Sequence, residues 1–157
     1  MCGWCDYNCY KCIIPCNERD KSVNYDNLGF NSVTIQNKYG QFTGYAWCCD
    51  EDMANGKYSM YVGQRYAETR ARQAFAKFRW KQEKVKLKTM QNLYKDLLND
   101  PKCADDKSLR YVQIKVRDYT ESVENWGNLY HYYKRSIKEQ EEMREKILNR
   151  AKEEKDS

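Results

Sequence analysis

Residues 109–137 read LRYVQIKVRDYTESVENWGNLYHYYKRSI, and this stretch has the most regular hydrophobic spacing in the chain. Apolar and aromatic side chains recur at alternating intervals of three and four residues, which is the spacing of a coiled-coil seam. The stretch predicts one helix from Leu109 to about Lys152, roughly 65 Å long, with a solvated end over residues 139–155. The predicted seam consists of Leu109, Val112, Val116, Tyr119, Val123, Trp126, Tyr130, Tyr133, Ile137, Gln140, Arg144, Ile147 and Ala151.

A helix of that length needs a partner, and the preceding part of the chain offers one. Residues 62–99 are good helix formers without proline, and Pro101 with the Asp and Ser residues after it breaks the pattern. The two segments predict an antiparallel, coiled-coil-like hairpin within one chain. The same seam would also serve a homodimer through the second helix.

A shorter segment upstream has strand character. Residues 31–38 and 41–49 alternate apolar and polar side chains around a turn at Tyr39-Gly40, which predicts an antiparallel β-hairpin. Two strands alone are marginal in water, so we expect the hairpin to lie against a helix or a third strand.

The composition fits one small, mostly helical α+β unit. Charged residues make up 32% of the 157 and aromatic residues 14%, with two Pro and seven Gly. The mean hydropathy of −1.04 predicts a thin core held by aromatic residues. We divide the chain into a cysteine cluster (1–16), a polar connector with the hairpin (17–61) and the long helical hairpin (62–157).

The cysteine cluster is the densest chemistry in the sequence. Five thiols lie within fifteen residues, at Cys2, Cys5, Cys9, Cys12 and Cys16. They include two Cys-x-x-Cys pairs, and such pairs direct two sulfur atoms at one tetrahedral Zn²⁺ ion. Because export signals are not apparent, the thiols should meet a reducing cytosol, where clustered cysteines bind metal more often than they form disulfides. We predict a structural zinc and a cytoplasmic location.

Two alternatives for the thiols stay open. The pairs are separated by only three residues, unlike those of an ordinary zinc finger, so one pair could join Cys48 and Cys49 instead. The three-four spacing would also suit small buried side chains on one helix face. We favour metal binding over buried thiols, and one ion held by four of the five clustered thiols over the arrangement with Cys48 and Cys49.

Positive charge is concentrated in the first long helix. Residues 62–99 carry ten Lys or Arg and three Asp or Glu, although the net charge of the whole chain is only +5. We take as candidate binding residues Arg65, Arg70, Arg72, Lys77, Arg79, Lys81 and Lys84. A basic helix of this kind can bind phosphates or an acidic protein surface, or it can simply be a solvated face.

Catalysis has little support in the sequence. The single histidine, His131, lies in the second helix pattern, and there is neither a Ser/His/Asp grouping nor a glycine-rich phosphate loop. We therefore expect a non-enzyme.

One motif carries a resemblance. Gly44-x-Ala46-x-Cys48, Asp50-x-Asp52 and Gly63-x-x-x-Ala67-x-x-Arg70-Ala71 cover roughly a third of the chain. Together they resemble a group of small phage-encoded accessory proteins of unknown role. The small residues would let the helix lie close on the strands, in a manner similar to double-stranded-RNA-binding domains. The resemblance implies a protein that binds and blocks a host macromolecule, such as a defence nuclease in the manner of anti-CRISPR proteins, with direct nucleic-acid binding as the alternative.

Overall fold

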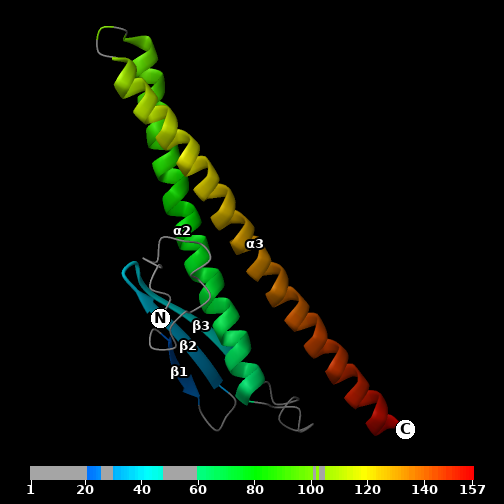
Figure 1. Ribbon diagram of the computed structural model, residues 1–157. Coiled ribbons are helices and arrows are strands. Elements are labelled where there is room, and N and C mark those ends of the chain that lie inside the picture. The colour runs from blue at the N-terminus through cyan, green and yellow to red at the C-terminus, as the bar shows by residue number, and fades with distance from the viewer. Residues whose placement is uncertain (1–20, 26–29, 48–59, 101, 103–104) are drawn as a thin grey trace. The chain divides into compact units, whose positions relative to one another are not determined.

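The computed structural model describes residues 21–25, 30–47, 60–100, 102 and 105–157 (Figure 1). The elements are β1 (Lys21–Tyr25), β2 (Phe30–Asn37), β3 (Gly40–Trp47), α2 (Met60–Asn99) and α3 (Asp106–Asp156). The predicted α+β class, with an antiparallel β-hairpin followed by two long helices, is confirmed. The cysteine cluster at 1–16, like Cys48 and Cys49, lies outside the described residues.

The hairpin is part of a three-stranded antiparallel sheet of order β1-β2-β3. Its two-residue loop is Lys38-Tyr39, and the Asn37 Oδ1 atom accepts a hydrogen bond of 2.9 Å from the Tyr39 backbone N–H. Gly40, with φ of 128°, then opens β3 in a backbone conformation that favours glycine. Residues 21–25, which polar composition placed in a connector, form the strand β1 beside β2. Five residues with little alternation are too short to stand out as a strand.

The N-terminal half of α2 packs very closely on one face of the sheet. A Cβ atom added at Gly44 would lie 1.9 Å from the Ala67 carbonyl oxygen and 2.4 Å from the Ala71 nitrogen. Val33, Ala46 and Ala67 form the buried core there, and Phe42 packs on Phe75 with ring centroids 4.9 Å apart. The small residues of the motif therefore lie at the closest approach of helix and strand.

The second helix begins at a well-formed cap. The Asp105 carboxylate accepts a hydrogen bond of 2.6 Å from the Ser108 backbone N–H, which places Asp105 at the N-cap. The hydrogen bonds with Ser108 hold the pKa of the Asp105 carboxyl below its usual value. The helix start lies a few residues before the predicted Leu109, because the capping residue precedes the apolar pattern.

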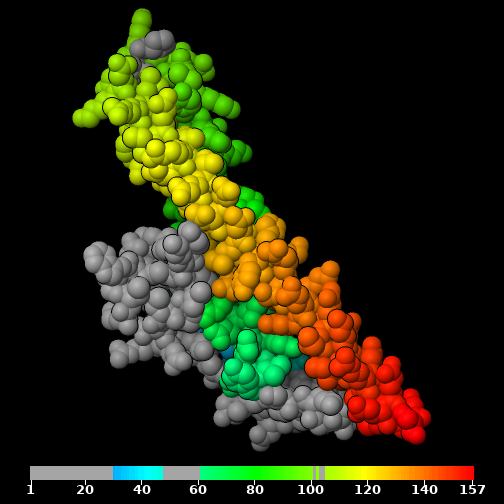
Figure 2. Space-filling view, turned by 45° about the vertical axis from the view of Figure 1, so that its right-hand side comes forward, coloured from blue at the N-terminus to red at the C-terminus, as the bar shows by residue number. Residues whose placement is uncertain are grey.

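The chain forms two compact units, and both helices contribute to each. The first unit joins the described residues up to Phe75 with His131–Ser157, and the second consists of the described residues between Ala76 and Tyr130. In the second unit, residues 76–99 of α2 and 106–130 of α3 run antiparallel, with the side chains of the two helices in contact (Figures 1 and 2). Pairs such as Tyr94 with Gln113 near the hairpin end and Trp80 with Tyr130 farther down define this alignment.

The predicted seam of α3 faces inward along most of its length. Val112, Trp126 and Tyr133 are buried, Tyr130 is half-buried, and Tyr132 is exposed as expected. Residues 139–155 differ from the predicted solvated end. Gln140 is half-buried and donates to Thr69 Oγ1 at 3.1 Å, and Leu148 and Ala151 are buried. Gln140 and Ala151 belong to the predicted seam, so the three-four spacing describes this end of α3 better than its polar composition does. Among the described residues, no helix is long and apolar enough to cross a membrane.

Candidate polyanion-binding surface

The seven predicted basic residues of α2 separate into two groups. Arg72 and Arg79 are buried, Arg70 is half-buried, and the other four are exposed. Because α2 has 3.6 residues per turn, positions 72 and 79 lie on the helix face toward α3, and positions 77, 81 and 84 lie on the opposite face. The two arginines thus belong to the interior of the fold.

Arg72 is held in the first unit by Glu68, four residues before it on the same helix, through a short ion pair. Tyr133 of α3 is its neighbour across the seam. Burial raises the pKa of the Tyr133 hydroxyl, and the nearby Arg72 charge acts in the opposite direction. The seam between α2 and α3 near Arg72 and Tyr133 therefore contains polar side chains, and the buried Arg72 charge has an ion-pair partner.

Arg79 forms the corresponding arrangement in the second unit. Its guanidinium lies 3.3 Å from Glu83 and donates a 2.8 Å hydrogen bond to Gln82, and its central carbon lies 5.1 Å from the Trp126 ring centroid. Lys86 approaches the same Glu83 carboxylate at 2.8 Å and lies 5.8 Å from the Tyr119 ring centroid. The side chains of Arg79 and Glu83 are each only 4% exposed. Attraction between a cation and an aromatic face adds to these ion pairs.

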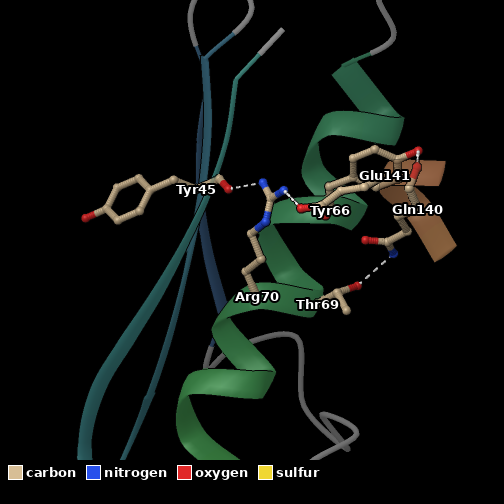
Figure 3. Close-up of polar contacts among 6 residues, drawn as sticks. All are labelled: Tyr45, Tyr66, Thr69, Arg70, Gln140 and Glu141. Carbon is tan, nitrogen blue, oxygen red and sulfur yellow. Dashed lines mark hydrogen bonds and ion pairs between the residues drawn. The ribbon is translucent and has the colours of Figure 1, made fainter. Parts of the chain in front are cut away.

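Arg70 has a bridging role in the first unit. Its guanidinium donates at 2.6 Å to the Tyr45 carbonyl oxygen of β3 and lies 3.4 Å from the Glu141 carboxylate of α3 (Figure 3). Tyr66 and Thr69 also contact Gln140 in the same region (Figure 3). Arg65 lies near the Tyr61 ring and lines a groove of about 510 Å³ together with Tyr66, Glu139 and Met143. Neither arginine is part of the exposed basic face in the second unit.

That exposed basic face consists of lysines alone, and we call it the lysine face: Lys77, Lys81, Lys84, Lys88 and Lys95. Their spacing of four, three, four and seven residues confines them to a stripe roughly 60° wide along about 27 Å of helix. All five are exposed, and none has an ion-pair partner among the residues that the structure describes. The stripe therefore presents uncompensated positive charge.

Lys84 is the most constrained member of the lysine face. Its ammonium nitrogen lies 3.4 Å from the Trp80 ring centroid, and the Trp80 ring is stacked with that of Tyr130 at a centroid distance of 5.4 Å. Gly127 makes room for the indole, because a Cβ there would lie 2.9 Å from Trp80 Nε1. The aromatic pair fixes one lysine in place on the stripe.

The sequence predicts the basic helix but does not separate its two faces, and the predicted set of binding residues omits Lys88 and Lys95. A signal for the separation was present in the sequence. Glu68 and Glu83 lie four residues from Arg72 and Arg79, at the spacing of helical ion pairs, and the two arginines are seven residues apart as seam positions are.

Within the described part of the chain, no three His, Cys, Asp or Glu side chains gather as a metal site would require. The predicted ligands Cys2, Cys5, Cys9, Cys12 and Cys16 lie outside it. Comparison of the chain with protein-family models, with curated proteins and with solved structures finds no match.

Proposed function

We propose that this protein is a non-enzymatic binding protein whose lysine face contacts the phosphate backbone of a nucleic acid. The observation that carries the proposal is the exposed stripe Lys77, Lys81, Lys84, Lys88 and Lys95, which has no ion-pair partner among the described residues. A uniform polyanion fits such a stripe well, because duplex DNA carries one negative charge per roughly 1.7 Å of its axis. About 27 Å of helix can then meet phosphates without a fixed register.

Residue type favours nucleic acid over an acidic protein surface. Lysine is depleted and arginine enriched in protein interfaces, whereas lysine binds phosphate as a point charge. Arg72 and Arg79 are engaged inside the fold, so the exposed charge of this face is lysine only. Such a surface suits binding that does not depend on base sequence.

The test is a salt titration of binding to a labelled DNA duplex, measured by fluorescence anisotropy. With five phosphate contacts, log Kobs should fall against log salt with a slope of about −4.5. The variant K77Q/K81Q/K88Q should flatten that slope by about 2.7, because each lost contact removes about 0.9. Lys84 is left unchanged since it packs on Trp80.

A matched control removes the same charge elsewhere. The variant K134Q/K146Q/K155Q changes three exposed lysines of α3 outside the lysine face, and its slope should equal that of the unmodified protein. Equal slopes for both triple variants, or absence of binding at low salt, would show that the lysine face does not contact phosphates.

The second candidate is a phage-type accessory protein that binds and blocks a host macromolecule, such as a defence nuclease, in the manner of anti-CRISPR proteins. It is supported by the resemblance carried by the motif Gly63-x-x-x-Ala67-x-x-Arg70-Ala71, whose two alanines are fully buried where α2 approaches Gly44 of the sheet. Capture of host proteins with the full chain, followed by mass spectrometry with and without nuclease treatment, tests it. A host protein retained after nuclease treatment and lost in K77Q/K81Q/K88Q supports this candidate over direct nucleic-acid binding.

A further inference from the structure

The sheet presents aromatic side chains on the face opposite α2. Strand alternation places Val33, Gly44 and Ala46 toward the helix and their neighbours Tyr45 and Trp47 on the other side. Figure 3 shows the Tyr45 ring pointing away from α2 while its carbonyl oxygen meets Arg70. Tyr45 is 57% exposed and Trp47 is 66% exposed.

Phe30 of β2 completes this cluster, which we call the aromatic face: Phe30, Tyr45 and Trp47. Its ring centroid lies 5.3 Å from that of Trp47 and 5.9 Å from that of Tyr45. Phe30 pairs with Trp47 in the strand register, so the half-buried ring supports the exposed indole from the neighbouring strand. Arg70 fixes the backbone of β3 between the two exposed rings by its 2.6 Å hydrogen bond to Tyr45.

The described strand residues around the aromatic face are mostly polar, and none of them is acidic. Residues 21–25 and 30–47 contain Lys21 and Lys38 but neither Asp nor Glu. Thr34 and Thr43 are joined by a 2.8 Å hydrogen bond next along the same face, and Gln36 and Gln41 follow as an exposed pair toward the turn. A ligand that follows β3 from Trp47 to Gln41 would meet two rings and then hydroxyl and amide groups.

We propose that the aromatic face binds unpaired bases of a single-stranded nucleic acid. Tyr45 and Trp47 are two residues apart on one strand, so their rings are separated by about 6.8 Å along it and can each stack one of two successive bases. Every base offers a stacking surface, and the described residues of the three strands add no carboxylate that would repel the phosphates between the bases. This inference rests on the proposed function and adds unpaired bases to the phosphates that the protein contacts.

The test compares a twelve-residue oligo-dT, a twelve-residue oligo-U and a twelve-base-pair DNA duplex, all bound to the full chain purified without chelators. Trp47→Ala should weaken binding of the single strands by about 5- to 150-fold, which is the range of one lost base stack. Trp47→Phe should retain most of the affinity because it keeps a ring. Duplex affinity and the salt slope should stay unchanged in both variants, since neither removes a charge. A loss confined to oligo-dT or to oligo-U assigns the face to that kind of strand.

Tyr132→Ala is the matched control, because Tyr132 is a 55% exposed aromatic residue on α3 outside the aromatic face. It should bind all three probes as the unmodified protein does. Unchanged single-strand affinity in Trp47→Ala overturns this inference. The proposed function still stands in that case if K77Q/K81Q/K88Q flattens the salt dependence of duplex binding. If the unmodified protein binds no probe, the proposed function fails and this inference fails with it.

Discussion

At the residue scale, Gly44 decides how closely the sheet and α2 approach each other. A Cβ at this position would meet backbone atoms of Ala67 and Ala71, and backbone cannot rotate out of the way as a side chain can. Gly44→Ala should therefore lower the free energy of unfolding by about 3 kcal/mol, at the upper end of overpacking effects. Urea unfolding followed by circular dichroism measures the change.

Gln41→Ala on the same strand is the control, because Gln41 is exposed. It should change the unfolding free energy by less than about 0.5 kcal/mol. If Gly44→Ala is as stable as Gln41→Ala, the close contact between β3 and α2 is absent in solution.

At the element scale, α2 depends on charges that it buries. The Glu83 carboxylate holds both Arg79 and Lys86, and Arg79 lies almost completely inside the seam. Glu83→Gln removes the charge that compensates the buried guanidinium, which should destabilise the fold by about 3 kcal/mol. Thermal and urea unfolding would record this loss, whereas Glu121→Gln at an exposed site of α3 should have little effect.

A double variant identifies the cause of the Glu83 effect. Arg79→Met combined with Glu83→Leu removes both charges and fills similar volume, so it should recover most of the stability lost in Glu83→Gln. If the double variant is less stable than the single one, the ion pair contributes more than compensation of a buried charge.

The long elements could be predicted from sequence, and the exceptions have physical reasons. The hairpin followed from two alternating runs and a glycine turn, and α3 followed from the three-four spacing between Leu109 and Ile137. The core face of α2 was not apparent because it uses Arg72, Arg79 and Glu83, which are residue types of protein surfaces. For the same reason the lysine face could be recognised only once those arginines were placed inside. The aromatic face could not be predicted from the sequence. Alternation places Gly44 and Ala46 on one side of β3 and Tyr45 and Trp47 on the other, but it does not show which side is buried.

At the scale of the whole molecule, the described core is thin, with few large side chains fully buried. Small folds with thin cores often gain stability from a metal site. We predict that the protein purified without chelators contains about one zinc ion per chain, held by four of the five thiols between Cys2 and Cys16 or by a pair of them with Cys48 and Cys49. Elemental analysis measures the content.

Replacement of two thiols, as in Cys5→Ser with Cys9→Ser, should lower the zinc content and the thermal midpoint. Cys103→Ser serves as the control because Cys103 lies far from the cluster in the sequence. Protein that contains neither zinc nor iron contradicts the prediction and leaves the thiols as packing residues.

The glycine that makes room for Trp80 has a consequence for the pairing of the two helices. In the second unit, Arg79 meets Trp126 and Lys86 meets Tyr119, so the cation-aromatic pairs repeat every seven residues on both helices. A slip by one heptad would bring Arg79 opposite Tyr119 and preserve such a pair. The same slip would place Trp80 opposite Thr120, or in the other direction Lys134, where a side chain occupies the space left free at Gly127. Gly127, which weakens the helix, thereby favours the observed alignment of α2 and α3 over the two alignments shifted by seven residues.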